Sequence, residues 1–235
     1  MAQPKLDCHE CESHCIGSLT CLPEDILEQF NISKSPRVYK AGQIIFYEDN
    51  KPFGVYCVER GKIKLTKYTP DGKSYIARIA KAGDLLGYRA FLTHEPYSAT
   101  AEVLEEATVC FLERDLFLKA LKEHPGFAFQ LMEQLGNDLK TAENRARDMA
   151  YKSVPERLAE LLLAMKETYG SVNANGDTRL DIRLTREEMA SLLGTTVETT
   201  VRNLTRFKQK GLIAFEKKDI LLKDIRGLAE YIPSL

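Results

Sequence analysis

The sequence predicts an α+β fold, with strands in the first half of the chain and helices in the second. Three observations predict it. Apolar and polar residues alternate between turn signals over residues 36–112, an apolar seam of helical period begins near residue 125, and two short helical segments meet at Gly194. The 235 residues suffice for one large domain or two modest ones. The apolar content of 44% and the charged content of 29% are typical of a soluble globular protein.

Residues 36–112 are expected to form several short strands that close or roll into a β-barrel. The segment GKIKLTKY alternates between an apolar face and a polar one: Ile63 and Leu65 against Lys62, Lys64 and Thr66. Asp71-Gly72 indicates a tight hairpin, because both residues tolerate the positive φ angles of such a turn. Glycines punctuate the region at residues 42, 54, 61, 72, 83 and 87, which is typical of a rolled barrel.

From about residue 125, apolar residues recur at spacings of four and three and form one narrow seam: Ala128, Met132, Leu135, Leu139, Ala142, Ala146 and Met149. The residues between them are mostly charged or polar. A sustained narrow seam favours a long helix that pairs with a second copy of itself. The alternative is a surface helix that lies on its own barrel.

The C-terminal region predicts a helix-turn-helix. A helix is expected from Pro155 to Gly170, followed by a loop and a short strand. Thr185 and Glu188 then form a capping box, the helix breaks at Gly194, and Thr195 with Glu198 opens a second box. The segment IAFEKKDILL supplies two strands around Lys217-Lys218, which is the pattern of a wing.

A basic stripe covers the end of the second helix and the wing. Residues 199–218 hold six Lys and Arg against one Glu, although the net charge of the chain is only −1. Such a stripe is the pattern of a nucleic-acid contact. The residues expected to meet DNA are Thr195, Thr196, Glu198, Thr199, Val201, Arg202, Arg206 and Lys208. Of these, Glu198, Val201 and Arg202 share one helix face and suit base edges, whereas Arg206 and Lys208, like Lys210, suit phosphates.

Four cysteines lie within the segment DCHECESHCIGSLTC: Cys8, Cys11, Cys15 and Cys21. The N-terminus lacks the pattern of a signal peptide, and no stretch is long and apolar enough for a transmembrane helix. We therefore expect a cytoplasmic protein with no membrane partner, in which clustered thiols bind metal or sense redox state. A zinc site that uses His9 or His14 is one alternative.

The residues quoted above resemble the cyclic-AMP receptor/fumarate-nitrate regulator (CRP/FNR) superfamily of bacterial transcription factors. GDLLGY is similar to a characteristic turn of their β-roll, and TVETTVRNLTRF is similar to the recognition helix of the FNR branch, with Val201 in place of its serine. The resemblance implies a cyclic-nucleotide-binding-like jelly roll, a long dimerisation helix and a winged helix-turn-helix. It also implies a homodimer that binds a pseudo-palindromic promoter site with a TTGA-like half-site, and RNA polymerase as a partner. The expected divisions are residues 1–30 for the cysteine-rich segment, 31–124 for the roll, 125–150 for the dimerisation helix and 151–235 for the DNA-binding domain.

The resemblance also bears on the effector. The superfamily's cyclic-nucleotide cassette has a Glu after the GDxxG turn and an Arg-Ser pair soon afterwards, where this chain has Tyr88 and Tyr97-Ser98. Arg78 and Arg89 lie nearby but off the pattern. A buried cyclic phosphate would then lack its charge partner, so cyclic AMP is not expected to bind.

FNR-branch sensors hold a [4Fe–4S] cluster with three N-terminal cysteines and one in the roll. The resemblance implies Cys15, Cys21 and Cys110 as ligands, with Cys8 or Cys11 as the remaining one; Cys57 is expected to be a core thiol. The predicted function is therefore a regulator that senses oxygen, nitric oxide or redox state. A zinc or thiol switch and an unidentified small-molecule effector remain alternatives. A cupin-like enzyme is a distant one, because His94 and His124 are isolated and no catalytic motif is present, so no enzyme is expected.

Overall fold

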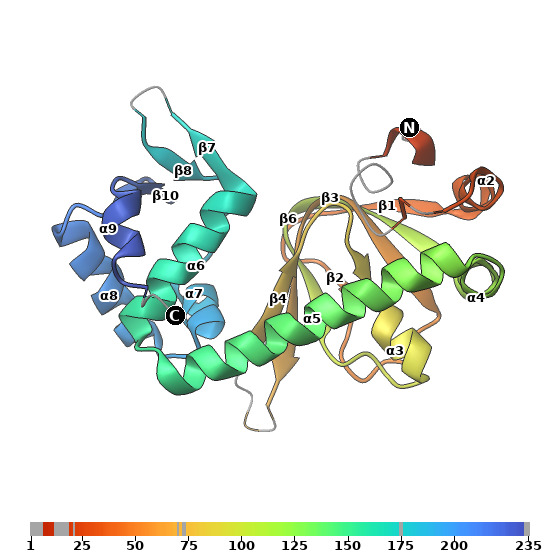
Figure 1. The fold of residues 1–235 in the computed structure, drawn as a ribbon, viewed down its shortest axis with the longest axis horizontal. Helices are drawn as coiled ribbons and strands as arrows, with labels where there is room; N and C mark the ends of the chain where they lie inside the picture. Colours follow the sequence, from red (N-terminus) through yellow and green to blue (C-terminus); the bar gives the residue numbers. More distant parts are fainter. Residues whose placement is uncertain are drawn as a thin grey trace. The chain divides into compact units, whose positions relative to one another are not determined.

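The computed structural model describes residues 7–11, 19–20, 22–69, 71, 74–173 and 176–232. The chain forms two compact units, Met1–Lys140 and Thr141–Leu235. The long helix α5 (Pro125–Tyr151) contributes to both units, and Figure 1 traces the order of the elements. The predicted α+β class is confirmed: the first unit combines a six-stranded sheet with helices, and the second combines helices with a four-stranded sheet.

The first unit is a β-roll built on one antiparallel sheet. Its strand order is β1-β6-β3-β4, with β2 paired to β6 and β5 paired to β3. The strands are β1 (Ser35–Tyr39), β2 (Ile44–Phe46), β3 (Gly54–Tyr68), β4 (Ser74–Ala80), β5 (Leu85–Leu86) and β6 (Thr100–Glu113). The predicted hairpin joins β3 to β4, where Tyr68 pairs with Ser74; residues 70, 72 and 73 of its turn lie outside the described residues.

Two strands of the roll are much longer than the short strands that we predicted. β3 has 15 residues and β6 has 14, and they pair along most of their length through repeated register shifts. Gly61 lies inside β3 at one of these bulges, with φ of +94°, and does not end a strand. A Cβ atom at Gly61 would come within 2.5 Å of Ala107 Cβ, so a side chain has no room there. A glycine in a strand marks a bulge as readily as a turn, which the sequence alone does not distinguish.

The predicted alternation in β3 holds for Ile63 and Leu65, which are buried, but is wrong for Thr66. Thr66 was expected on the polar face, yet it is buried. A register shift between Leu65 and Thr66 in the pairing with β4 turns its side chain inward. Because the side-chain period of a strand is two residues, one bulge is enough to exchange the two faces.

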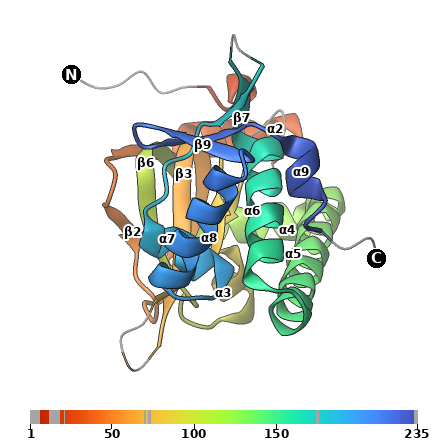
Figure 2. The same cartoon turned by 90° about the vertical axis from the view of Figure 1, so that its left-hand side faces the viewer.

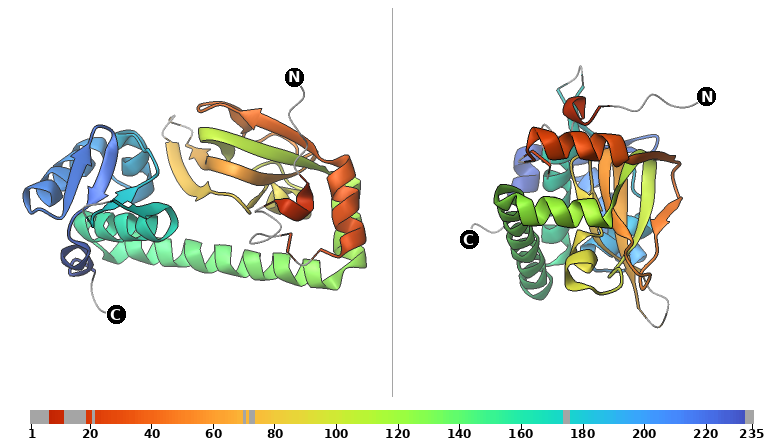
Figure 3. Two further views of the ribbon diagram at one scale, coloured as in Figure 1. Left: turned by 90° about the horizontal axis from the view of Figure 1, so that it is seen from above. Right: turned by 90° about the vertical axis from the view of Figure 1, so that its right-hand side faces the viewer.

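Short helices that we did not predict cover one side of the roll: η1 (Cys8–Glu10), α2 (Glu24–Ser33), α3 (Tyr88–Thr93) and α4 (Arg114–Glu123). α2 and α4 lie side by side against the sheet (Figure 3). Their buried side chains, with Phe127 and Leu131 of α5, join the inner residues of β3 and β6 in one core. Cys8, Cys57 and Cys110 belong to this core, together with Leu19 and Leu22.

The predicted seam on α5 lies largely in solvent within the single chain. Met132 is 54% exposed and Leu139 is 61% exposed, and Ala142 and Ala146 are exposed as well. Leu135 differs from the expected pattern, because it is partly buried against the core of its own roll. The face that meets the roll is therefore formed by Phe127, Leu131 and Leu135, and the exposed apolar stripe lies beside it.

The second unit is a three-helix core with a small antiparallel sheet. α6 (Val154–Tyr169), α7 (Arg186–Leu193) and α8 (Val197–Gln209) pack on one another (Figure 2). The sheet order is β7-β8-β10-β9, and its strands are β7 (Gly170–Val172), β8 (Thr178–Leu180), β9 (Ile213–Glu216) and β10 (Asp219–Leu222). A short helix, α9 (Ile225–Ala229), follows. The region after α6 thus holds a two-stranded hairpin, one strand more than predicted.

The helix caps decide where α7 and α8 begin. Ser153 and Glu156 form a capping box at the start of α6, and Thr185 and Glu188 form the box that we predicted at the start of α7. The second predicted box is wrong: the N-cap of α8 is Thr196, whose hydroxyl accepts from the Thr199 N–H at 3.2 Å. Glu198 is therefore not a capping residue.

Within the described part of the chain, no helix is long and apolar enough to span a membrane.

Candidate DNA-binding surface and cysteine site

The turn between α7 and α8 is built around Gly194. Its φ is +62°, the left-handed conformation that glycine adopts without strain. A Cβ atom there would lie 2.9 Å from Cε of Met149, so Met149, which we predicted at the dimer seam, also packs against this turn. Guanidinium groups of Arg145 and Arg157 donate to the carbonyls of Leu192 and Leu193, at 2.8 and 3.0 Å. These bonds satisfy the last carbonyls of α7 and fix the turn.

α8 presents one face to the core and one to solvent. Its buried residues are Thr200, Asn203, Leu204 and Phe207. The predicted DNA-contacting residues lie on the open face: Thr196, Glu198, Val201, Arg202, Arg206 and Lys208 are exposed, and Thr195 and Thr199 are partly exposed. The helix is thus held by one side and free to enter a groove with the other.

The first turns of α8 carry groups that suit base edges. Because Thr196 caps the helix, the carboxylate of Glu198 is available to accept a hydrogen bond from cytosine N4. Arg202 lies one turn further along on the same face and suits guanine O6 and N7. Lys210, which suited phosphate by its spacing, instead donates to the Tyr231 hydroxyl at 2.7 Å.

Two arginines at the start of α7, Arg183 just before the helix and Arg186 as its first residue, were not singled out from the sequence. Arg183 and Arg186, with Lys217 and Lys218 of the wing, line a cavity of about 480 Å³ whose remaining walls are largely apolar. The Arg186 guanidinium lies 4.7 Å from the centre of the Phe215 ring. Both arginines lie within two residues of Thr185, the N-cap of α7. A search for basic residues near the start of this helix would have found them.

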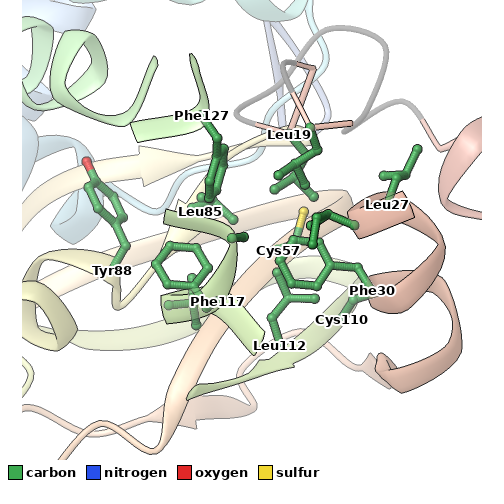
Figure 4. Close-up of a cluster of buried hydrophobic side chains, with 14 of the residues drawn as sticks. Leu19, Leu27, Phe30, Cys57, Leu85, Tyr88, Cys110, Leu112, Phe117 and Phe127 are labelled. Carbon is green, nitrogen blue, oxygen red and sulfur yellow. The ribbon is translucent and has the colours of Figure 1, made fainter. Parts of the chain in front are cut away.

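The cysteine site begins with two thiols on the roll. Cys57 of β3 and Cys110 of β6 are directly opposite each other in the sheet, and both are buried. Figure 4 shows them in the core beside Phe30 and Leu112. Directly opposed residues place their side chains on the same face of a sheet. Cys57 is therefore a core thiol, as predicted, but a neighbour of the predicted ligand Cys110.

The N-terminal segment packs onto this face of the roll. Cys8 is buried in the same core, its N–H donates to Asn31 Oδ1 at 3.1 Å, and Cys11 is partly exposed. Next to Cys8, the ring of His9 lies between Asp7 and Glu24, with nitrogen–oxygen distances of 2.6 and 2.7 Å. These contacts attach η1 to α2. The thiols of Cys8, Cys11 and Cys110 lie close enough to influence one another electrostatically.

Burial of Cys8 and Cys110 disfavours the thiolate form of their side chains. Desolvation raises the pKa of Cys110 to about 12 and also raises the pKa of Cys8. The nearby ammonium of Lys34 opposes both shifts in pKa, because a positive charge favours the thiolate. A metal or cluster at this site would have to displace the thiol protons.

Two of the predicted ligands, Cys15 and Cys21, lie outside the described residues. Leu19 and Leu22, which flank Cys21 in the sequence, are buried in the same core as Cys110. Among the described side chains, no three potential metal ligands converge on one point. The predicted ligands that are described, Cys8, Cys11 and Cys110, have thiols of the type that iron–sulfur clusters require, and the buried Lys34 ammonium donates to Cys8. The residues present therefore fit a thiolate-ligated group, with Cys15 and Cys21 needed to complete it.

The part of the roll that corresponds to a cyclic-nucleotide cassette is filled by aromatic side chains. The Tyr97 ring stacks on Phe46, with centroids 4.0 Å apart, and lies against the backbone of Gly87. Tyr88 is buried, and its hydroxyl donates to Asp138 of α5. The cavity that remains has a volume of about 30 Å³, and Arg78, Arg89 and Ser98 contribute to its lining.

A β-roll joined by a long helix to a winged helix-turn-helix, with an exposed reading face on α8, defines a DNA-binding transcription regulator. Residues 36–124 match the cyclic nucleotide-binding domain family, and residues 156–231 match the Crp-like helix-turn-helix domain family. The chain belongs to the CRP/FNR superfamily and is not an enzyme.

Similar proteins include a transcriptional activator named without an effector and a regulator described as cAMP-activated. The transcriptional activator protein anr of Pseudomonas aeruginosa is 29% identical over 95% of this chain and 91% of its own. The CRP-like cAMP-activated global transcriptional regulator of Mycobacterium tuberculosis is 28% identical over 83% of this chain and 86% of its own. The solved structure of FixK2 from Bradyrhizobium japonicum has a TM-score of 0.74 at 24% identity, over 86% of this chain and 98% of that one. These similarities do not identify one effector, so the residues of this chain have to indicate it.

Proposed function

We propose that this transcription regulator acts as a homodimer and senses oxygen, nitric oxide or redox state through a [4Fe–4S] cluster. The ligands in this proposal are Cys15, Cys21, Cys110 and one of Cys8 or Cys11. The observation that carries it is the packing of Cys8, Leu19 and Leu22 into the core that holds Cys110. The similarity to anr, whose name describes a transcriptional activator, supports activation through RNA polymerase.

The proposal extends to DNA recognition. The residues proposed to meet DNA are Thr195, Thr196, Glu198, Thr199, Val201, Arg202, Arg206 and Lys208. In a two-fold symmetric dimer the two α8 helices would enter major grooves about one helical turn, ~34 Å, apart, so the site is expected to be pseudo-palindromic. The proposed dimer contact is the exposed stripe of α5, formed by Met132, Leu139, Ala142, Ala146 and Met149. The proposed divisions of the chain are 1–30, 31–124, 125–150 and 151–235.

Cyclic AMP is not the effector in this proposal. The aromatic filling of the cassette and the cavity of about 30 Å³ support this, since pockets for ligands of such size are roughly 300 Å³ or larger. A zinc or thiol switch at the same cysteines is the second candidate. It is favoured by the part-exposed Cys11 and by His9, a residue type that binds zinc and that directly follows Cys8 in the sequence.

Anaerobic reconstitution with iron and sulfide tests the cluster. We expect about four iron and four sulfide per chain and a broad brown absorbance that disappears in air. Cys110→Ala should abolish it, whereas Cys57→Ala, a matched loss of a buried thiol directly across the sheet, should not. Cys8→Ala compared with Cys11→Ala identifies the fourth ligand. A colourless protein, or one whose zinc survives air, contradicts the cluster and supports the second candidate.

A further inference from the structure

A cavity of about 480 Å³ lies in the winged domain, and neither the cysteine site nor the residues proposed to meet DNA line it. Its walls are largely apolar and come from α6, the segment before α7, α7 itself and both strands of the wing; they include Met165, Ile182, Met189, Phe215 and Ile220. The volume is within the range of small-molecule sites, roughly 300–1,000 Å³. The cavity is therefore large enough to enclose the apolar body of a small ligand.

The charged groups that line this cavity are cations: Arg183, Arg186, Lys217 and Lys218. The lining residues that the structure describes include no Asp or Glu. Arg183 already has a partner, because its Nε donates to Asp219 at 2.9 Å, and the same carboxylate also attracts Lys217. In the described part of the chain, no carboxylate forms an ion pair with Arg186 or Lys218. These two cations are left for an anionic ligand.

Arg186 is the more enclosed of the two, since it is partly buried whereas Lys218 is exposed. Its guanidinium lies 4.7 Å from the centre of the Phe215 ring, and its Nη1 lies 3.6 Å from Sδ of Met189, a weak acceptor. Burial lowers the pKa of Arg186, and the exposed carboxylate of Glu187 offsets only part of this effect. A guanidinium has more N–H donors than the ring and the sulfur engage, so Arg186 is held in place with donors to spare.

The occupant that fits both the walls and the cations is an anion with an apolar body. Removal of that body from water against side chains such as Met165 and Ile182 is favourable. A carboxylate or sulfonate head matches the planar fork of the Arg186 guanidinium. A backbone phosphate of DNA would satisfy the cations but would gain nothing from the apolar walls, and a neutral apolar molecule would leave the cations without a partner.

We propose that this cavity binds an amphipathic anion, an acyl or aryl carboxylate or the corresponding sulfonate, with its body against Met165 and Met189 and its head on Arg186. The inference is independent of the cysteine site, because every residue that it uses belongs to the second compact unit. Arg186 is the first residue of α7, so the ligand would bind at the helix-turn-helix itself.

Phe215→Trp in the full-length protein provides a reporter in the cavity wall, because the chain has no other tryptophan. The probe is sodium decanoate, and decan-1-ol is its neutral counterpart with the same chain length. We expect decanoate to shift the tryptophan emission to shorter wavelength in a saturable way, since its chain displaces water from the indole, and decan-1-ol to bind more weakly.

Arg186→Gln, added to Phe215→Trp, should weaken decanoate binding roughly tenfold, as expected for the loss of a hydrogen bond to a charged group. Arg226→Gln removes the same charge from an exposed position on α9 that does not line the cavity, and it should leave the affinity unchanged. Thermal unfolding shows whether each variant is folded. If Arg186→Gln is not, Lys218→Gln at an exposed position takes its place.

Three results would overturn the proposal. Decanoate at millimolar concentration that leaves the emission unchanged shows that the anion does not enter; a shift with a duplex of TTGA-like half-sites would then assign the cations to DNA phosphates. Equal binding of decanoate and decan-1-ol shows an apolar cavity without an anion site. Equal loss of affinity in Arg186→Gln and Arg226→Gln shows that only the overall charge of the domain matters.

Discussion

The hydroxyl of Tyr88 on α3 donates a hydrogen bond of 2.7 Å to Oδ2 of Asp138 on α5. Tyr88 is buried, and the same carboxylate has the Arg78 guanidinium 3.9 Å away; Arg78 also faces Asp84. Burial and the neighbouring carboxylate of Asp138 both raise the pKa of Tyr88, so the phenol stays protonated and acts as a donor. Tyr88 stands at the position where the superfamily's cassette has a Glu. In this chain, that position connects the roll to the long helix.

Tyr88→Phe removes this donor and leaves Asp138 without it. The segment of α5 up to residue 140 should become easier to open by about 1.5–3 kcal/mol, the range for a hydrogen bond to a charged group. Amide hydrogen exchange over residues 130–140 measures this directly. Thr93→Val, which removes an exposed hydroxyl of α3 that donates to the Arg89 carbonyl, is the control and should leave exchange there unchanged. Equal exchange in Tyr88→Phe and wild type would contradict the link.

Millimolar cyclic AMP should shift neither the unfolding temperature nor the DNA affinity of this protein. A ligand stabilises a protein only by binding its folded state, and the cavity lined by the stacked rings of Tyr97 and Phe46 has a volume of only about 30 Å³. Thermal unfolding with and without cyclic AMP measures this, with the cAMP-activated relative from Mycobacterium tuberculosis as the positive control. A clear upward shift would show that the aromatic rings move aside.

Leu139→Glu should convert a dimer into monomers and abolish operator binding. Leu139 is 61% exposed in the single chain, so the roll should fold normally, while a dimer would bring two like charges together at its axis. Sedimentation velocity measures the oligomeric state. Lys140→Gln changes the net charge equally at the next residue, off the stripe, and should remain dimeric. A dimer that persists in Leu139→Glu would move the interface away from this stripe.

The elements with strong local signals could be predicted from the sequence. The long helix, the capping box of Thr185 and Glu188, and the left-handed Gly194 follow from periodicity and from residue chemistry within a few positions. The sequence does not distinguish Thr195 from Thr196 as the N-cap of α8, since both are threonines. The geometry of the turn decides in favour of Thr196. The prediction for Thr66 was wrong because the bulge depends on how β3 pairs with β4, which the alternation of residues along one strand does not show.

The sequence predicted the cysteines of the site but not how the fold places them relative to one another. Cys57 is 53 residues from Cys110, and only the register of β3 on β6 shows that they face each other. Lys34 carries no motif; its burial beside Cys8 depends on how α2 packs on the roll. Leu135 shares the seam's spacing, yet it packs inward, because the boundary between two adjacent helix faces is set by the neighbouring core.

Arg202→Ala should weaken binding to the cognate duplex by about 1–3 kcal/mol and relax the preference at one guanine. Arg206→Ala, one turn further along, should weaken all sequences alike and reduce the salt dependence of binding by about one phosphate contact. Fluorescence anisotropy on cognate and scrambled duplexes at several salt concentrations separates the two effects. Equal losses on both duplexes for Arg202→Ala would assign Arg202 to the phosphates.

Asp219 should make the winged domain lose stability in acid. Its carboxylate accepts from Arg183 Nε and lies 2.9 Å from a guanidinium nitrogen of Arg179, which connects β10 to β8 and to the segment before α7. The hydrogen bond from Arg183 and the two positive charges hold the pKa of Asp219 below its ordinary value near 3.9.

A carboxyl whose pKa is lower in the folded state stabilises the fold fully above its unfolded pKa. That contribution is lost as the pH falls below about 4 and through the folded pKa. Asp219→Asn should therefore be less stable than the wild type at neutral pH and should approach it near pH 2–3. Thermal unfolding followed by circular dichroism between pH 2.5 and 7 measures the difference. Asp181→Asn alters an exposed carboxyl 3.3 Å from Arg179 and should change little, because exposed ion pairs contribute little. A difference between Asp219→Asn and wild type that is the same at every pH would show that the carboxylate's charge is not what holds the wing.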